Sequence, residues 1–170
     1  IGAQARFFAR IGGNTPKEMS QLFIDAQKFK GTSLIEVMQN CVIFNDGCFT
    51  SITDKDVKED QQIFLEHGKP MIFGKEHNKG LVLNGLKLEV VTLGENGITE
   101  NDILVHDAKC EDPTLHQMLV RMSHPVAVGI IRSFEDLTFE ERELELTKEV
   151  SKKSKFTKVD ELFFSGDTYE

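Results

Sequence analysis

Three cysteines carry the most specific chemistry in this 170-residue chain: Cys41, Cys48 and Cys110. Cys41 follows a short apolar run at 34–38, and an Asn-Asp-Gly turn at 45–47 comes shortly after it. This order predicts a buried parallel strand ending at Cys41, on the edge where open α/β sheets bind ligands. A thiol there is either a small buried hydrophobic group or a ligand for a soft metal. Residue pattern alone favours the buried thiol, because Cys48, seven residues later, completes no known cluster spacing.

Other polar residues give weaker indications. The five histidines lack metal-binding spacing, and an exposed loop position for His106 is favoured over an acid–base pair with Asp107. The glycines at 12–13 precede a helix, where an anion could bind, but an ordinary turn is the commoner use of such a segment. Arg10 and Lys17 are minor candidates for anion contacts, with solvated surface charge as the favoured role.

Composition limits the class of protein. The length suits one domain with a proper core. A net charge of −8 argues against a nucleic-acid partner, because such proteins cluster Lys and Arg. No apolar run approaches the roughly 20 residues of a membrane span, and no leader is visible. An odd number of cysteines is a poor disulfide framework, so we expect a cytoplasmic protein with free thiols.

The first part of the chain predicts a β–α–β unit with a right-handed crossover. A strand is expected at 5–10 and a second one ends at Cys41. Between them, Thr15 as N-cap, Pro16 at the first helical position and Glu18 as partner in a capping box start a helix that Gly31 ends.

The remaining elements follow from apolar periodicity and turn residues. We expect helices at 54–67, 112–122 and 140–155, and strands at 71–74, 80–83, 86–90 and 126–132, with a strand or loop at 103–107. Asn84-Gly85 predicts a hairpin between two of these strands. The charged helix and the apolar residues at 156–164 need a covering surface, and packing on the same subunit is favoured over a partner subunit.

Several segments together resemble one family. They are Gly2-Ala3, the Phe-Phe-Ala-Arg run at 7–10, Pro16-Lys17, Ala26, Lys30-Gly31, the Asn-Cys-Val-Ile-Phe-Asn run at 40–45, the stretch at 93–107, 113–115 and Pro125 with 129–132. They resemble the C-terminal half of the β subunit of a 2-oxoacid:ferredoxin oxidoreductase, the thiamine-diphosphate-binding subunit, and most of all its 2-oxoglutarate type.

The resemblance implies an α/β fold: the second half of a thiamine-diphosphate-binding domain, with a mainly parallel sheet flanked by helices and a hairpin excursion. Residues 1–132 would form that domain part, and 133–170 a charged helical tail with an apolar end. The chain begins at Ile1, almost inside a strand, so we expect a subunit fragment.

The resemblance also implies cofactors and partners. The complete subunit would bind thiamine diphosphate, Mg²⁺ and a [4Fe-4S] cluster, with Cys41 as the fourth cluster ligand, screened from water by the apolar residues at 42–44. Cys48 and Cys110 would be structural thiols. Phe29 stands where the family usually has histidine. The remaining cluster and diphosphate ligands would lie upstream, so this chain alone should bind neither cofactor and should be inactive.

The implied reaction is the oxidative decarboxylation of a 2-oxoacid with coenzyme A to acyl-CoA and CO₂, with electrons passed to ferredoxin and an α subunit as partner. Two alternatives stay open. One is a non-catalytic α/β interaction module acting through its charged helix. The other is a half-domain of a different thiamine-dependent decarboxylase or transketolase without iron.

Overall fold

The computed structural model describes residues 1–167, and the chain divides into two compact units. Unit 1 comprises residues 1–135, and unit 2 begins at Asp136. Unit 1 contains the strands and Cys41, whereas unit 2 is helical.

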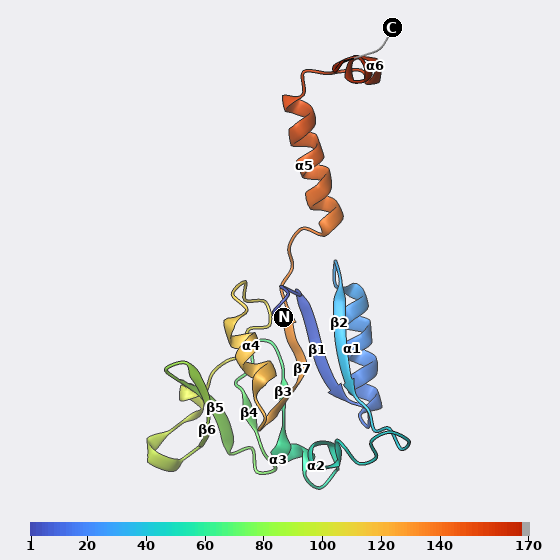
Figure 1. Ribbon diagram of the computed structural model, residues 1–170. Coiled ribbons are helices and arrows are strands. Elements are labelled where there is room, and N and C mark those ends of the chain that lie inside the picture. The colour runs from blue at the N-terminus through green and yellow to red at the C-terminus, as the bar shows by residue number, and fades with distance from the viewer. Residues whose placement is uncertain (168–170) are drawn as a thin grey trace. The chain divides into compact units, whose positions relative to one another are not determined.

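A four-stranded mixed sheet forms the centre of unit 1 (Figure 1). Its strand order is β2-β1-β7-β3, with bounds β1 (Phe7–Gly12), β2 (Ser33–Met38), β3 (Gln62–Leu65) and β7 (Val126–Ser133). Parallel pairs join β1 to β2 and β3 to β7, and an antiparallel pair joins β1 to β7. The predicted α/β fold with a mainly parallel sheet is confirmed.

Helix α1 (Pro16–Lys28) connects β1 to β2, as predicted, but its capping differs. The hydroxyl of Thr15 donates to the carbonyl of Gly12 at 2.8 Å instead of accepting a bond from the first turn. The capping box with Glu18 is therefore wrong, because the preceding turn already engages the Thr15 side chain. The helix ends at Lys28 with Phe29 as C-cap, so the predicted C-cap at Gly31 is also wrong.

The predicted helix at 54–67 is wrong. Helix α2 (Thr50–Thr53) precedes this segment, and the segment itself forms one single-turn helix, α3 (Lys58–Gln61), followed by β3. Ile63 and Leu65 are buried while Phe64 between them is half exposed, which is the period-two pattern of a strand. Pairing with β7 outweighs the helical propensity of the charged residues before it.

A smaller antiparallel sheet of order β4-β5-β6 packs beside the large one; its strands are β4 (Ile72–Phe73), β5 (Lys79–Asn84) and β6 (Lys87–Thr92). The predicted hairpin is confirmed, with Gly85 at φ +59° in its turn. Two 3₁₀ turns follow, η1 (Glu95–Gly97) and η2 (Glu100–Asp102). Segment 103–107 is a loop with a single bridge between Pro70 and Val105.

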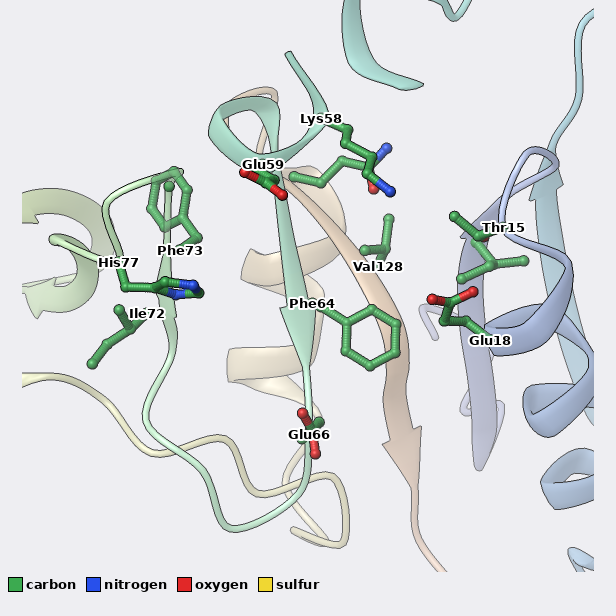
Figure 2. Close-up of a pocket in the computed structure, with 13 residues that line it drawn as sticks. Thr15, Glu18, Lys58, Glu59, Phe64, Glu66, Ile72, Phe73, His77 and Val128 are labelled. Carbon is green, nitrogen blue, oxygen red and sulfur yellow. The ribbon is translucent and has the colours of Figure 1, made fainter. Parts of the chain in front are cut away.

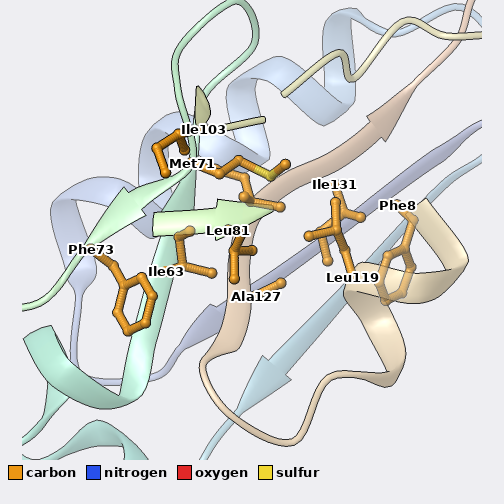
Figure 3. Packing of buried hydrophobic residues seen from close by; sticks show 10 residues of the cluster. Phe8, Ile63, Met71, Phe73, Leu81, Ile103, Leu119, Ala127 and Ile131 are labelled. Atoms are coloured by element: carbon orange, nitrogen blue, oxygen red, sulfur yellow. The ribbon is translucent and has the colours of Figure 1, made fainter. Parts of the chain in front are cut away.

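Apolar clusters cover both faces of the large sheet. On one face α1 packs on β1, where the rings of Phe7 and Phe29 lie 5.2 Å apart. On the other face, α4 (Thr114–Arg121) and the small sheet enclose the larger cluster (Figure 3). Its buried members are Phe8, Ile63, Leu65, Met71, Phe73, Leu81, Ile103, Leu119, Ala127 and Ile131. The predicted helix at 112–122 and strand at 126–132 are thus confirmed, with ends shifted by one or two residues.

Unit 2 consists of α5 (Phe139–Lys153) and α6 (Val159–Phe163). Thr138 and Glu141 form a capping box that starts α5. Neither helix has a buried residue, and the side chains of Leu144, Leu146 and Val150 are exposed. The surface that covers them stays a prediction. Within residues 1–167, no helix combines the length and apolar character needed to cross a membrane.

Candidate functional site

Cys41 lies in a tight loop three residues beyond Met38, the last residue of β2. The carbonyl of Cys41 accepts a hydrogen bond from the amide of Asn45 at 3.0 Å, which closes the loop. Asn40 supports it from outside, because its side chain accepts from the amide of Gly47 and donates to Asp46, both at 2.8 Å. Strand β2 pairs in parallel with β1, so Cys41 does follow the carboxyl end of a parallel strand, as predicted. The predicted burial of that strand is wrong, because β2 is an edge strand of the sheet and only its last residue, Met38, is buried.

Backbone amides of its own loop donate hydrogen bonds to the Cys41 thiol. Hydrogen bonds from the amide of Phe44 and, less strongly, those of Ile43 and Asn45 lower the pKa of Cys41 below its usual value. The thiolate is the form that binds metals and acts as a nucleophile. The loop therefore favours the reactive form of a cysteine that is itself exposed.

Exposure of this loop corrects two predictions. The buried thiol favoured by the residue pattern is wrong, since Cys41 is exposed. Val42, Ile43 and Phe44 do not screen it, because 74%, 81% and 89% of these residues are exposed. Apolar side chains at a loop tip pack against nothing within one chain, so the expected screening would need another surface. Cys48 is half buried, and Cys110 is exposed on a separate loop, which does not fit a structural thiol.

The five histidines and three cysteines do not gather into a metal centre within the described part of the chain. No group of three or more His, Cys, Asp or Glu side chains in residues 1–167 is arranged to hold a metal ion. Cys41 can supply one thiolate, and a cluster there would need sulfurs from outside these residues.

A groove runs along the sheet face beside α1 (Figure 2). Two adjoining cavities of about 480 Å³ each share Glu18, Phe64 and Glu66 in their walls. Phe64 is the centre of the floor, and Glu18 of α1 faces it from one side. The opposite wall of the first cavity includes Ile72 and His77. Neither the groove nor its half-exposed Phe64 was predicted, because β3 was assigned to a helix.

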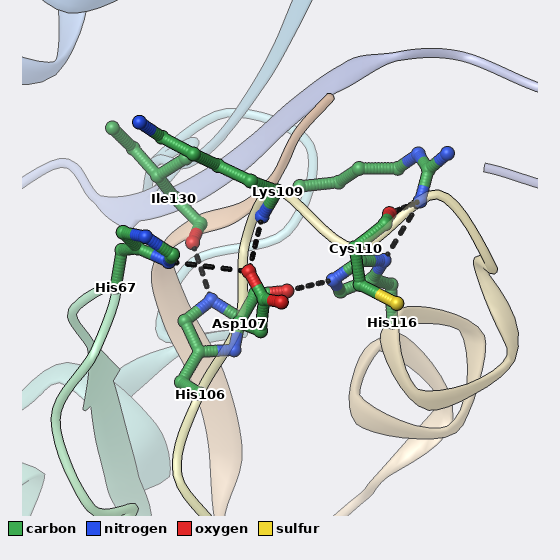
Figure 4. Close-up of polar contacts among 8 residues, drawn as sticks. His67, His106, Asp107, Lys109, Cys110, His116 and Ile130 are labelled. Carbon is green, nitrogen blue, oxygen red and sulfur yellow. Dashed lines mark hydrogen bonds and ion pairs between the residues drawn. The ribbon is translucent and has the colours of Figure 1, made fainter. Parts of the chain in front are cut away.

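His106 is fully buried, so its predicted place as an exposed loop histidine is wrong (Figure 4). Its Nε2 lies 3.0 Å from the carbonyl of Ile130, which can only accept, so Nε2 carries the proton. Burial is the main cause that lowers the pKa of His106. Asp107 does not pair with it; the carboxylate lies instead 3.3 Å from Nδ1 of His67.

Next to His106, the buried side chains of His116 and Arg132 form a hydrogen-bonded pair, which residue spacing gave no means of predicting. Nε2 of His116 donates to the carbonyl of Asp107 at 2.8 Å, and its Nδ1 accepts from Arg132 at 3.0 Å. The guanidinium also donates to the carbonyls of Cys110 and Glu111, both at 2.8 Å. This arrangement ties the loop at 107–111 to β7.

The structure gives each of the weaker candidates for anion contacts a different environment. Arg10 is not a solvated charge, because its Nε donates to Glu36 at 2.8 Å and its side chain is mostly buried. Lys17 is exposed in the first turn of α1, as expected. The glycines at 12–13 form a turn, in which the amide of Thr15 bonds to the carbonyl of Gly12.

Comparison with known proteins gives one informative relative. The chain is 33% identical over 146 residues to the 2-oxoglutarate oxidoreductase subunit KorB of Mycobacterium tuberculosis. The match covers 83% of this chain and 38% of the relative, so the chain spans well under half of that protein's length. No protein-family model matches, and no solved structure is significantly similar.

The relative agrees with the resemblance inferred from the motifs. The mixed α/β architecture, with its mainly parallel sheet flanked by helices, is consistent with half of a thiamine-diphosphate-binding domain. By sequence and fold, the chain belongs to the β-subunit family of the 2-oxoacid:ferredoxin oxidoreductases, as part of such a subunit.

Proposed function

We propose that the chain is part of a 2-oxoacid:ferredoxin oxidoreductase that acts on 2-oxoglutarate with coenzyme A. The sequence similarity to KorB, whose name specifies 2-oxoglutarate, is the observation that carries this proposal. In the complete enzyme the products would be an acyl-CoA, CO₂ and reduced ferredoxin. Residues 1–132, which end within β7, would belong to the thiamine-diphosphate-binding domain, and the charged helices that follow unit 1 would be an extension of it.

Cys41 is the residue we assign to the [4Fe-4S] cluster. Clusters of this kind are held by cysteine thiolates, and hydrogen bonds to their sulfurs tune the reduction potential. The Cys41 thiol fits that role because it is exposed and accepts backbone hydrogen bonds from its own loop. When bound, the cluster would carry single electrons away from the reaction centre.

We assign no residue in the described part of the chain to the binding of thiamine diphosphate or Mg²⁺. The chain contains no glycine-rich phosphate loop, and residues 1–167 hold no metal-binding group of three. The chain's own contribution is to hold the Cys41 loop rigidly at the end of β2, through the Asn40 hydrogen bonds described above.

The exposed tip at 42–44 supports the assignment of a protein partner to this loop. Three consecutive apolar side chains at 74–89% exposure are costly in water, and burial of each would contribute about 1.5 kcal/mol or more. We propose that the rest of the oxidoreductase, including its α subunit, covers this tip and excludes water from the cluster.

The experiment is the substitution Cys41→Ser in the complete oxidoreductase, compared with Cys48→Ser. Iron content, visible cluster absorbance and 2-oxoglutarate-dependent ferredoxin reduction should all fall in Cys41→Ser. Cys48 is half buried and seven residues away on the same loop region, so its variant controls for loss of a thiol as such.

Unchanged iron and absorbance in Cys41→Ser would remove Cys41 from the cluster. A normal cluster without turnover of 2-oxoglutarate, but with turnover of another 2-oxoacid, would contradict only the proposed substrate.

A further inference from the structure

The loop at 107–111 is fastened to the sheet by side chains rather than by strand pairing. His116 of α4 and Arg132 of β7 together bind the carbonyls of Asp107, Cys110 and Glu111. One backbone bond, from the amide of Ser133 to the carbonyl of Ala108 at 2.6 Å, adds to them. Both fastening side chains are at least 98% buried, so water does not compete for these bonds.

The protonation state of His116 decides whether this fastening is possible. A carbonyl only accepts and a guanidinium only donates, so His116 must be neutral with its proton on Nε2. A second proton would have to sit on Nδ1, pointing at an Arg132 N–H 3.0 Å away, with two positive charges in contact. The hydrogen bonds that fasten the loop can therefore form only while the His116 imidazole is neutral.

The loop is also a wall of the groove. Ala108 and Lys109 line the second cavity together with Glu18 and Leu22 of α1. A movement of the loop away from β7 would therefore change the width of that cavity.

We propose that His116 and Arg132 form a pH-sensitive latch, which holds the loop at 107–111 closed beside the groove and releases it when His116 is protonated. The proposal is independent of the oxidoreductase assignment, because it rests on the buried contacts of unit 1 alone.

Other charged groups around the latch modulate it without replacing it. Those that face His116 are Arg132 from β7, and Asp107, Asp112 and the ring of His106 from the loops before α4; Arg132 in turn faces Arg6, Cys110, Asp112 and Glu111. Burial is the largest cause that lowers the pKa of His116, and Arg132 adds to it, while Asp107 and Asp112 oppose them. Hydrogen bonds from Thr114 hold the pKa of Asp112 below its ordinary value, so this carboxylate keeps its charge near neutral pH, and the buried histidines are the groups whose charge changes.

Amide hydrogen exchange of the full chain, followed by NMR, tests the latch. The reporters are the amides of Cys110 and Ser133, which bond to Asp107 and Ala108 across the loop. With rates corrected for the intrinsic effect of pH, protection of both should fall about tenfold or more between roughly pH 7.5 and pH 5.

Three variants separate the latch from other titrations. His116→Gln keeps a donor and an acceptor but cannot be charged, so its loop should stay protected at both pH values. His106→Gln removes the neighbouring buried histidine and should leave the pH dependence in place. His77→Gln, an exposed histidine across the groove, is the matched surface control.

Equal loss of protection in His116→Gln and the wild type would overturn the proposal, as would a flat wild-type profile. A pH dependence abolished by His106→Gln instead would assign the effect to that residue. If His116→Gln does not fold, the titration of the His116 ring in the wild-type chain, followed by NMR, tests the latch instead. Its midpoint must coincide with that of the loop amides, and a different midpoint rejects the latch.

Discussion

Gly129 has the most constrained backbone position in the large sheet. It lies within β7 at φ +92°, a conformation that side chains with a Cβ rarely adopt. A Cβ there would lie 2.7 Å from the carbonyl oxygen of Leu65 on the neighbouring strand. Both the left-handed conformation and the close strand contact therefore require glycine.

We expect Gly129→Ala to lower the free energy of unfolding by about 2–4 kcal/mol, from backbone strain and the clash together. Gly85→Ala should cost only about 1 kcal/mol, because Gly85 shares the positive φ but has no atom within 4 Å of the added Cβ. Urea unfolding of both variants measures these two losses in the free energy of unfolding. Equal losses would show that the strand contact adjusts freely.

For single residues, the sequence predicts the place of a residue relative to its helix or strand better than it predicts what surrounds the side chain. The place of Cys41 after a parallel strand followed from local apolar and turn residues. Its exposure did not, because burial depends on chain segments far away in sequence. The pairing of Asp107 with His67 rather than His106 has the same cause, since the two residues are brought together only by the fold.

At the scale of elements, two helices begin at a threonine but are capped differently. Thr138 accepts a bond from the amide of Glu141 at 3.2 Å, and the Glu141 carboxylate accepts from the amide of Thr138 at 2.9 Å. Thr15 makes no such bond to α1. The same residue type therefore stabilises the start of α5 directly, and α1 only through the preceding turn.

Thr138→Ala should destabilise the first turn of α5 by about 1 kcal/mol, because an amide there loses its acceptor. Exchange of the Glu141 amide should then accelerate about fivefold. Thr15→Ala, the matched control, should leave amide exchange in the first turn of α1 nearly unchanged. Similar acceleration in both helices would contradict the difference in capping.

Local sequence patterns are sufficient to predict some of the helices and strands but not others. The β–α–β unit and the β5–β6 hairpin are specified by nearby residues, such as Pro16 and Gly85, and were predicted correctly. Strand β3 was not, because its four residues follow a charged, helix-favouring stretch. What makes it a strand is β7, some sixty residues later, and no local pattern contains that pairing.

For the whole molecule, two buried neutral histidines make the stability of unit 1 depend on pH. The pKa values of His106 and His116 lie below the ordinary value of 6.5, mainly because of burial. An unfolded chain thus binds more protons than the folded one below pH 6.5. The stability from neutral burial is complete above that pH and is lost as the pH falls through the folded pKa values.

Urea unfolding at about pH 7.5 and about pH 5.5 should therefore give a lower midpoint at the acidic pH. The lowered pKa values of Asp60, Asp102 and Asp112 act below their ordinary value of 3.8, outside this window. The double variant His106→Gln/His116→Gln should lose most of the difference. A midpoint that does not move with pH in the wild type would refute this account.

The position of β7 determines when this molecule can fold. Among residues 1–167 it is the last strand, yet it lies between β1 and β3 and joins them into one sheet. During synthesis, β1 and β2 can pair early, but the other edge of β1 must wait for β7, more than a hundred residues later. Pairings this distant slow folding, because loop closure comes before any gain in contacts. A nascent chain that stops before residue 126 would expose the edges of β1 and β3, and such edges promote aggregation.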